Sequence, residues 1–142
     1  MDNIQKAIAA SEAKHSGEIR FAVEASLDIG PLWKGLAVRE RAIQVFSDLR
    51  IWDTAANNGV LIYLLLADHD VEIVADRGIA SKLVAEKWET ICQSMEKSLR
   101  AGKFEEAVLR AVEDVGRHLE THFPPKGGAD TDELPNKPLI IG

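Results

Sequence analysis

Hydrophobic positions recur along this chain with two different spacings, and the change of spacing marks out its secondary structure. Apolar and polar side chains alternate over residues 18–26, which is typical of a strand with one buried face. Residues 60–67, VLIYLLLA, are apolar without interruption, as in a central strand covered on both sides. A third short apolar run, residues 71–75, follows the polar turn Asp68-His69-Asp70. The pattern therefore predicts three strands.

The remaining apolar residues mostly fall three or four positions apart, which is the spacing of amphipathic helices. Helices are predicted over about residues 2–16, 36–49, 81–100 and 103–122. The segment 27–35 contains Gly30-Pro31 and Gly35, so it is predicted to be a loop.

The order of these elements predicts the topology of the sheet. A strand, a helix and a second strand form a right-handed crossover, so the first two strands run parallel. The connection over Asp68-His69-Asp70 is short, so the third strand runs antiparallel to the second. The chain is therefore predicted to have an α/β fold with a small mixed sheet, a βαβ unit, a β-hairpin and helices on both faces.

Pro124-Pro125 ends the last predicted helix. We therefore divide the chain into a domain over residues 1–123 and a flexible C-terminal tail over residues 124–142. The tail contains glycine, proline and acidic residues, which favour disorder or loose docking. Its one apolar patch, Leu139-Ile140-Ile141, could dock on a protein partner.

Composition narrows the range of functions. The formal net charge is -6, which argues against nucleic-acid binding and against docking on anionic lipid. The longest apolar run, residues 60–67, is too short to span a bilayer. The N-terminus lacks the pattern of a secretory signal, so we expect a cytoplasmic protein without direct membrane insertion. The single cysteine, Cys92, is expected to be a buried structural thiol.

Two polar motifs bracket the predicted hairpin, namely Asn57-Asn58-Gly59 and Asp76-Arg77-Gly78. A tight turn that pairs Ala67 with Val71 would place Val60 opposite about Gly78. Both motifs would then meet at one edge of the sheet. A helix that starts near residues 79–81 would add the free N–H groups of its N-terminus there.

Three interpretations of this cluster stay open. Arg77 and the helix N-terminus could bind an anion. Alternatively, Asp76 and Asn58 could provide oxygen ligands for Ca²⁺ or Mg²⁺. Asn-Gly and Asp-Arg-Gly are also ordinary turn and cap sequences.

The opposite edge of the sheet is an alternative location for a metal. Asp28 follows the first strand, and Asp68 and Asp70 follow the second. Ligands often bind at the carboxyl ends of parallel strands, so these three carboxylates could hold a divalent ion. A solvated hairpin turn would explain Asp68 and Asp70 equally well.

Histidines near the end of the chain do not match a zinc motif. His118 and His122 lie one helical turn apart, but Glu120 does not occupy the position of the acid in the zinc-protease pattern. We expect these histidines to have structural or solvent-facing roles.

Several segments resemble the TPM domain family. The resemblance lies in the strand opening Asn58-Gly59-Val60-Leu61, the hairpin, the helix that begins at Gly78, and the segment AGKFEEAVLRAVEDVGRHL at residues 101–119. VEIVADRGIA, HFP and DELPNKPLII are similar to a short bacterial form of the family. Exported members usually carry Gly-Tyr-Gly where this chain has Asp76-Arg77-Gly78.

The resemblance implies a three-layer α/β/α sandwich. It also implies possible roles, since some members are associated with divalent-cation binding or acid phosphatase activity, and bacterial members are linked with a LemA-type membrane protein. We expect a non-catalytic accessory domain that binds Ca²⁺ or Mg²⁺ or a protein partner. The alternatives are a metal-assisted phosphomonoesterase, with Asp76 on the metal and Arg77 on the phosphate, and a purely structural domain.

Overall fold

The computed structural model describes residues 2–26, 34–125 and 136–141, and side chains from residue 37 onward in the second range. The predicted loop at 27–35, with Trp33, lies mostly outside these residues. The described elements are α1 (Asp2–Glu12), β1 (Glu18–Glu24), α2 (Lys34–Asp48), β2 (Gly59–Leu65), the 3₁₀ turn η2 (Leu66–Asp68), β3 (Asp70–Ala75), α3 (Arg77–Ala80), α4 (Ala85–Arg100), α5 (Phe104–His122) and β4 (Leu139–Ile141).

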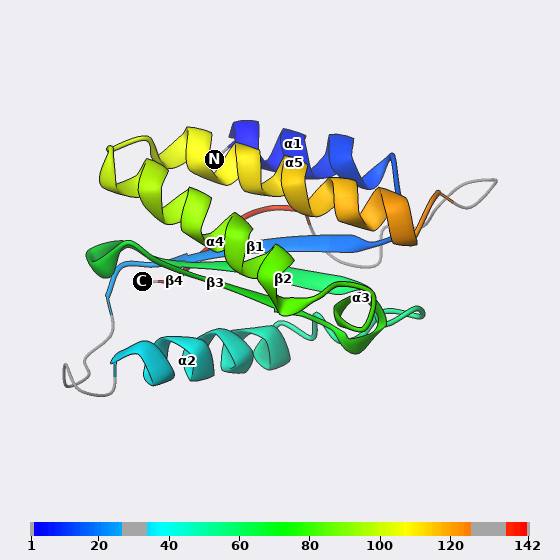
Figure 1. Ribbon diagram of the computed structural model, residues 1–142, viewed down its shortest axis with the longest axis horizontal. Coiled ribbons are helices and arrows are strands. Elements are labelled where there is room, and N and C mark those ends of the chain that lie inside the picture. The colour runs from blue at the N-terminus through cyan, green and yellow to red at the C-terminus, as the bar shows by residue number, and fades with distance from the viewer. Residues whose placement is uncertain (1, 27–33, 126–135, 142) are drawn as a thin grey trace.

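The elements form three layers, as Figure 1 shows. Helices α1, α4 and α5 cover one face of the sheet, and α2 covers the other. The strand order is β3-β2-β1-β4. The α/β/α sandwich is therefore confirmed, with β2 next to the centre and apolar toward both helical layers.

The βαβ unit and the hairpin are both confirmed. β1 runs parallel to β2, with Glu18 beside Gly59, and β3 runs antiparallel to β2. The predicted hairpin register was wrong, because Val71 pairs with Leu64 and not with Ala67. β2 already ends at Leu65, since residues 66–68 form the 3₁₀ turn and His69 takes the left-handed conformation at φ 55°.

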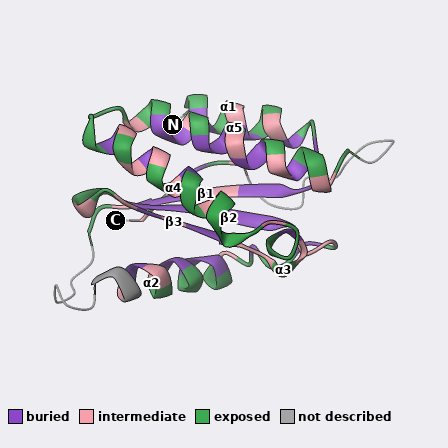
Figure 2. Ribbon diagram, in the orientation of Figure 1, coloured by how far each residue is buried: buried purple, intermediate pink, exposed green. Residues whose placement is uncertain are grey.

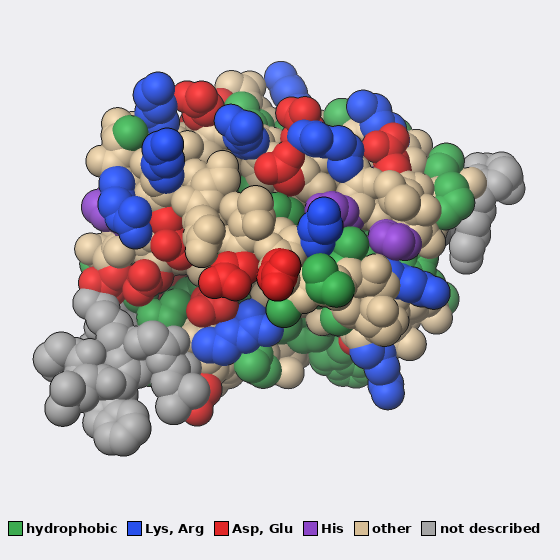
Figure 3. Space-filling model, viewed as in Figure 1, with side chains coloured by type: hydrophobic (Ala, Val, Ile, Leu, Met, Phe, Trp, Pro, Cys, Tyr) green, Lys and Arg blue, Asp and Glu red, His purple; other side chains and the backbone are tan. Residues whose placement is uncertain are grey.

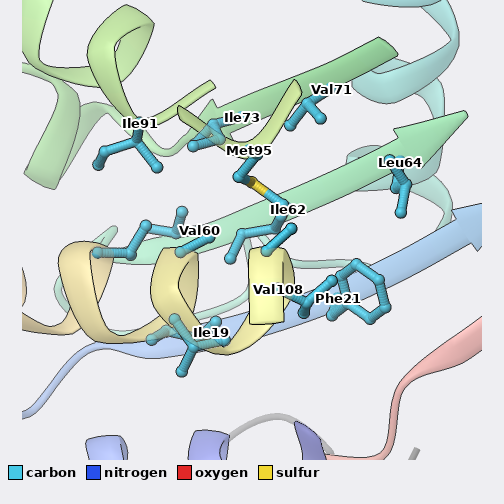
Figure 4. Packing of buried hydrophobic residues seen from close by; sticks show 14 of the residues in the cluster. Ile19, Phe21, Val60, Ile62, Leu64, Val71, Ile73, Ile91, Met95 and Val108 are labelled. Atoms are coloured by element: carbon cyan, nitrogen blue, oxygen red, sulfur yellow. The ribbon is translucent and has the colours of Figure 1, made fainter. Parts of the chain in front are cut away.

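Two hydrophobic clusters lie on opposite faces of the sheet, and Figure 2 shows the buried stripes that face it. The larger cluster joins β1, β2 and β3 to α1, α4 and α5, with Met95 and Val108 packed over the strands (Figure 4). The smaller one places Val38, Ala42 and Val45 of α2 against Leu61 and Tyr63. All seven residues of β2 are buried, which explains its unbroken apolar sequence.

Two helix boundaries differ from the prediction. α1 ends at Glu12 rather than near Ser16, because the following residues fold into a turn that side chains stabilise. The helix predicted over residues 81–100 begins at Ala85, and a separate one-turn helix, α3, precedes it. The helix start beside Asp76 therefore belongs to α3.

The last residues of the chain add a strand that the sequence pattern did not predict. Leu139–Ile141 forms β4, parallel to residues 22–24 of β1. Leu139 and Ile141 pack against the smaller cluster, whereas Ile140 is 65% exposed. The apolar end of the tail therefore contacts its own sheet, while residues 126–135 lie outside the described part.

Candidate functional site

The two bracketing motifs meet at one edge of the sheet, as predicted, although the register differs. Val60 lies beside Ala75, and the backbone N–H of Asp76 donates to the Gly59 carbonyl at 2.9 Å. Gly59 therefore lies opposite Asp76, where the prediction had placed Val60 opposite Gly78. This edge, at the beginning of β1 and β2 and the end of β3, is called the Asp76 edge below.

Asn57 and Asn58 occupy very different surroundings. Asn57 has a φ of 53°, a left-handed conformation that asparagine tolerates better than most residues. Asn58 is only 1% exposed. Its Nδ2 donates to the Ser16 carbonyl at 3.1 Å, which ties β2 to the turn before β1. Its Oδ1 is buried and has no hydrogen-bond partner among the described residues.

Asp76 caps α3 with one carboxylate oxygen, and its other carboxylate oxygen does not take part in the cap. Oδ1 accepts a 2.8 Å hydrogen bond from the Arg77 backbone N–H. Oδ2 is buried and has no hydrogen-bond partner within the described part of the chain. A buried carboxylate oxygen without a hydrogen-bond partner destabilises the folded state unless a water molecule or an ion binds it. Arg77 is exposed beside it.

Gly78 lets the two motifs approach closely. A methyl group at this position would lie within 3.0 Å of the carbonyl oxygens of Ala56 and Asn57. The loop before β2 thus packs directly on the backbone of α3, and two carbonyl oxygens lie beside the residue two places after Asp76. The geometry requires glycine for close approach rather than for an unusual φ.

A buried polar turn supports the same edge, and the sequence analysis did not identify it. Glu12, His15 and Glu18 are 9%, 1% and 3% exposed. Glu12 Oε2 accepts from the Ile19 backbone N–H at 2.9 Å. One signal was available, because Glu12 follows Ile4 and Ile8 at four-residue intervals on the buried face of α1.

Hydrogen bonds define the tautomer of His15. The Gly17 backbone N–H donates to Nδ1 at 3.1 Å, so Nδ1 carries no proton. Nε2 lies 3.0 Å from Ser11 Oγ and is therefore the donor to it. Both ring nitrogens are engaged in holding the turn between α1 and β1.

The alternative metal site at the opposite edge is only partly described. Asp28 lies outside the described residues, while Asp68 and Asp70 each interact with other groups. Among the described residues, no group of three His, Cys, Asp or Glu side chains could hold a metal ion. Asp76 therefore offers one carboxylate oxygen that has no hydrogen-bond partner among the described residues, and a single carboxylate can hold a hard cation only weakly.

Glu24, at the carboxyl end of β1, is bound by residues that the sequence analysis did not single out. Arg41 donates to it from Nε at 2.8 Å and from Nη2 at 3.1 Å. Tyr63 donates from its hydroxyl at 2.6 Å. Arg41 holds the pKa of Glu24 below its ordinary value, and burial of Tyr63 raises the pKa of its hydroxyl. These groups satisfy one another and connect β1, β2 and α2.

His118 of α5 and Cys92 of α4 are both partly buried. The His118 ring lies 6.2 Å from that of Trp88, and burial lowers the pKa of this histidine. Burial likewise raises the pKa of Cys92 to about 12. Within the described residues, no helix is long and apolar enough to cross a membrane.

Several solved structures have a fold similar to that of this chain. The chain is similar to the BA42 protein from the psychrophilic bacterium Bizionia argentinensis, with 32% identity and a TM-score of 0.85 over 99% of this chain and 91% of that one. The N-terminal domain of a protein from P. gingivalis is 17% identical, with a TM-score of 0.70 over 88% and 78% of the two chains.

A third similar fold is the N-terminal domain of the cg2496 protein from Corynebacterium glutamicum, at 16% identity and a TM-score of 0.59 over 90% of this chain and 74% of that one. A search of curated proteins found no match. The sequence model of the TPM domain matches residues 1–118. Together with the relationship to BA42, this match shows that the chain belongs to the TPM domain family.

Proposed function

We propose that this protein is a non-catalytic accessory domain that binds a divalent cation, Ca²⁺ or Mg²⁺, at the Asp76 edge. The observation that carries the proposal is the buried Oδ2 of Asp76, which has no hydrogen-bond partner within the described part of the chain. A hard cation is a natural partner for such an oxygen.

The surroundings of Asp76 support a weak cation site. Oδ1 of Asn58, at the same edge, is neutral and likewise has no hydrogen-bond partner among the described residues, and the carbonyls of Ala56 and Asn57 lie beside Gly78. With a single carboxylate, the expected dissociation constant is about 0.1–1 mM, in the range of weak extracellular-type calcium sites. Water would complete the coordination.

The hydrogen bonds of His15 favour a non-catalytic role for the protein. His15 is the imidazole buried at this edge, and both of its nitrogens hold hydrogen bonds to Ser11 and Gly17. A general base needs a nitrogen that is free to accept the substrate's proton. His15 is therefore a positioning group for the turn.

An amide-resolved NMR titration of the whole chain with Ca²⁺ and with Mg²⁺ tests the proposal. Saturable shifts are expected at residues 57–59 and 76–80. Asp76→Asn should abolish them, and the matched variant Asp68→Asn should keep them. Shifts at residues 68–70 that disappear in Asp68→Asn would move the site to the opposite edge. Titration to about 10 mM without saturation would overturn the cation site.

Exposure of Arg77 beside Asp76 favours one second candidate, a metal-assisted phosphomonoesterase in which Asp76 holds the metal and Arg77 binds the phosphate. Hydrolysis of p-nitrophenyl phosphate with Mg²⁺ distinguishes the two. The accessory function predicts no hydrolysis above background. Turnover that disappears in both Asp76→Asn and Arg77→Gln would establish the esterase instead.

For the partner, we propose a LemA-type or other membrane-associated protein, on the strength of the family resemblance. Co-purification with a co-expressed LemA-type protein tests this part separately. Loss of the complex on removal of residues 136–142 would assign the contact to the C-terminal strand, whereas equal recovery of wild type and an unrelated control domain would contradict a specific partner.

A further inference from the structure

A groove runs between the outer edge of β3 and helix α4, away from the Asp76 edge. Its apolar lining includes the partly exposed Trp88 and Cys92 beside the buried Val71 and Ile73, and its volume is about 470 Å³. β3 is the outermost described strand on this side of the sheet. The groove therefore lies where an edge strand would otherwise be open to another chain.

Side chains already bind the backbone of this edge. Arg39 donates from Nη1 to the Ile73 carbonyl at 2.7 Å. The carboxylate of Glu96 accepts a hydrogen bond from the backbone N–H of Val71. The backbone of Ile73 also forms a hydrogen bond with the side chain of Cys92. An incoming segment would have to break these bonds to add a strand. The groove is therefore suited to receive side chains.

Acidic groups surround this apolar lining. The groove is lined by the acidic residues Glu72, Glu89 and Glu96 and by the basic residue Arg39. Arg39 pairs with Glu72 at 3.1 Å. Figure 3 shows Asp and Glu side chains gathered on this face, over the region of β3 and α4. The groove thus combines an apolar surface with an excess of carboxylates.

Glu96 lies in partly buried surroundings that disfavour its negative charge. Burial raises the pKa of its carboxyl, and the negative charge of Asp70 raises it further. Arg100, at 3.5 Å from Glu96, opposes this effect without cancelling it. A cation that entered the groove would relieve the repulsion among these acids.

We propose that the groove binds an extended segment of a protein partner in which arginine or lysine alternates with apolar residues. The aliphatic part of each basic side chain covers the exposed part of Trp88, and its charged end reaches the carboxylates of Glu89 and Glu96. Arginine gains most, because its guanidinium binds carboxylates in pairs and stacks on an indole ring. This inference deepens the accessory role, but it does not depend on a cation at Asp76.

A peptide titration followed by NMR tests the groove in the whole chain. The probe is a blocked hexapeptide in which arginine alternates with leucine, and its matched control contains citrulline in place of arginine. Saturable shifts at residues 71–73 and 88–96 are expected with the arginine peptide. Binding should be about tenfold weaker with the citrulline peptide, in line with the loss of several partly exposed ion pairs.

Matched charge variants separate the groove from the general negative charge of the protein. Glu89→Gln with Glu96→Gln should weaken arginine-peptide binding about tenfold. Glu106→Gln with Glu113→Gln, two exposed positions on α5, removes the same charge and should change it less than about twofold. Urea unfolding checks that both pairs remain folded. Equal losses in the two pairs, or equal binding of both peptides, would overturn the proposal.

Other occupants give different results and would also overturn the proposal. A second copy would shift the groove residues on raising the protein concentration without peptide, and Ca²⁺ or Mg²⁺ alone would shift them in the absence of peptide. Asp76→Asn should bind the arginine peptide as the wild type does. That result distinguishes failure of the cation site from failure of the groove.

Discussion

Tyr63 donates a 2.6 Å hydrogen bond to Glu24 across the two central strands, and Arg41 of α2 binds the same carboxylate through two nitrogens. The side chain of Glu24 is only 12% exposed. An acid this well buried is stable as an anion because both partners donate to it. The contact joins the sheet to α2, which packs on that face.

The pH dependence of stability should reflect Glu24. Arg41, with a further contribution from Tyr63, holds the pKa of Glu24 below its ordinary value. The resulting stability is fully present above the unfolded pKa of about 4.3 and is lost as pH falls through the folded pKa. Glu24→Gln should cost about 1–3 kcal/mol at pH 7, measured by urea unfolding. The difference from wild type should shrink below about pH 4.

Glu113→Gln is the control for this prediction. Glu113 is 71% exposed and contacts Arg117 at 3.4 Å, so its loss should cost less than about 0.5 kcal/mol. An equal effect of both substitutions, or a Glu24→Gln difference that does not shrink as the pH falls below about 4, would contradict the assigned role of the buried pair.

Substitution of Gly78 should disturb the Asp76 edge. In Gly78→Ala, the new methyl group meets the carbonyl oxygens of Ala56 and Asn57, so the unfolding free energy should fall by about 1–3 kcal/mol. Gly102 has a φ of 78° and open space around it. Gly102→Ala should therefore lose about 1 kcal/mol from its backbone alone. Chemical shifts should move at residues 56–59 only in Gly78→Ala, and their absence would refute the close packing.

Adjacent residues of β4 should respond differently to charge. Leu139 packs against the smaller cluster, whereas Ile140 is 65% exposed. Leu139→Lys should reduce stability by about 1–2 kcal/mol through lost apolar burial, and Ile140→Lys by less than about 0.5 kcal/mol. Leu139→Lys should also accelerate hydrogen exchange at residues 22–24. Indistinguishable behaviour of the two variants would mean that β4 is not docked in solution.

Cys92 should react slowly in the folded protein. Burial, together with the charges of Glu72 and Glu96, raises its pKa to about 12. Its thiolate fraction at pH 8 should be on the order of 10³-fold lower than in the unfolded chain. Reaction with Ellman's reagent should be correspondingly slow in buffer and fast in urea. A rapid reaction in buffer would show that the thiol is accessible and unperturbed.

Local sequence patterns predicted most of the helices and strands. They did not predict the helix boundaries at which a side chain, and not the backbone, makes the hydrogen bond. The apolar run that contains β2 and the spacing of apolar residues in α5 each reflect the burial of a single element. Both elements can therefore be predicted from the local sequence. α1 stops at Glu12 because its carboxylate bonds to Ile19, seven residues later. The Asp76 cap likewise starts α3 as a separate short helix before α4.

The candidate site shows the same division. The residue types at the Asp76 edge could be identified from turn-forming motifs, and the hairpin brought them together despite the wrong register. Atoms from other segments determine three features of this edge, namely the lack of a hydrogen-bond partner for Asp76 Oδ2, the burial of Asn58 and the packing at Gly78. Sequence spacing carries no information on whether an oxygen is already bonded.

By itself, the sequence determined the alternation of strands and helices, the parallel crossover, the antiparallel hairpin and the meeting of the two polar motifs. Only the tertiary structure decided the hairpin register, the insertion of Leu139–Ile141 as β4, and the buried partners of Glu24 and His15. The reason is physical. Periodicity records which face of an element avoids water, whereas hydrogen-bond partners and edge pairing are set by long-range contacts between segments that the chain brings together only on folding.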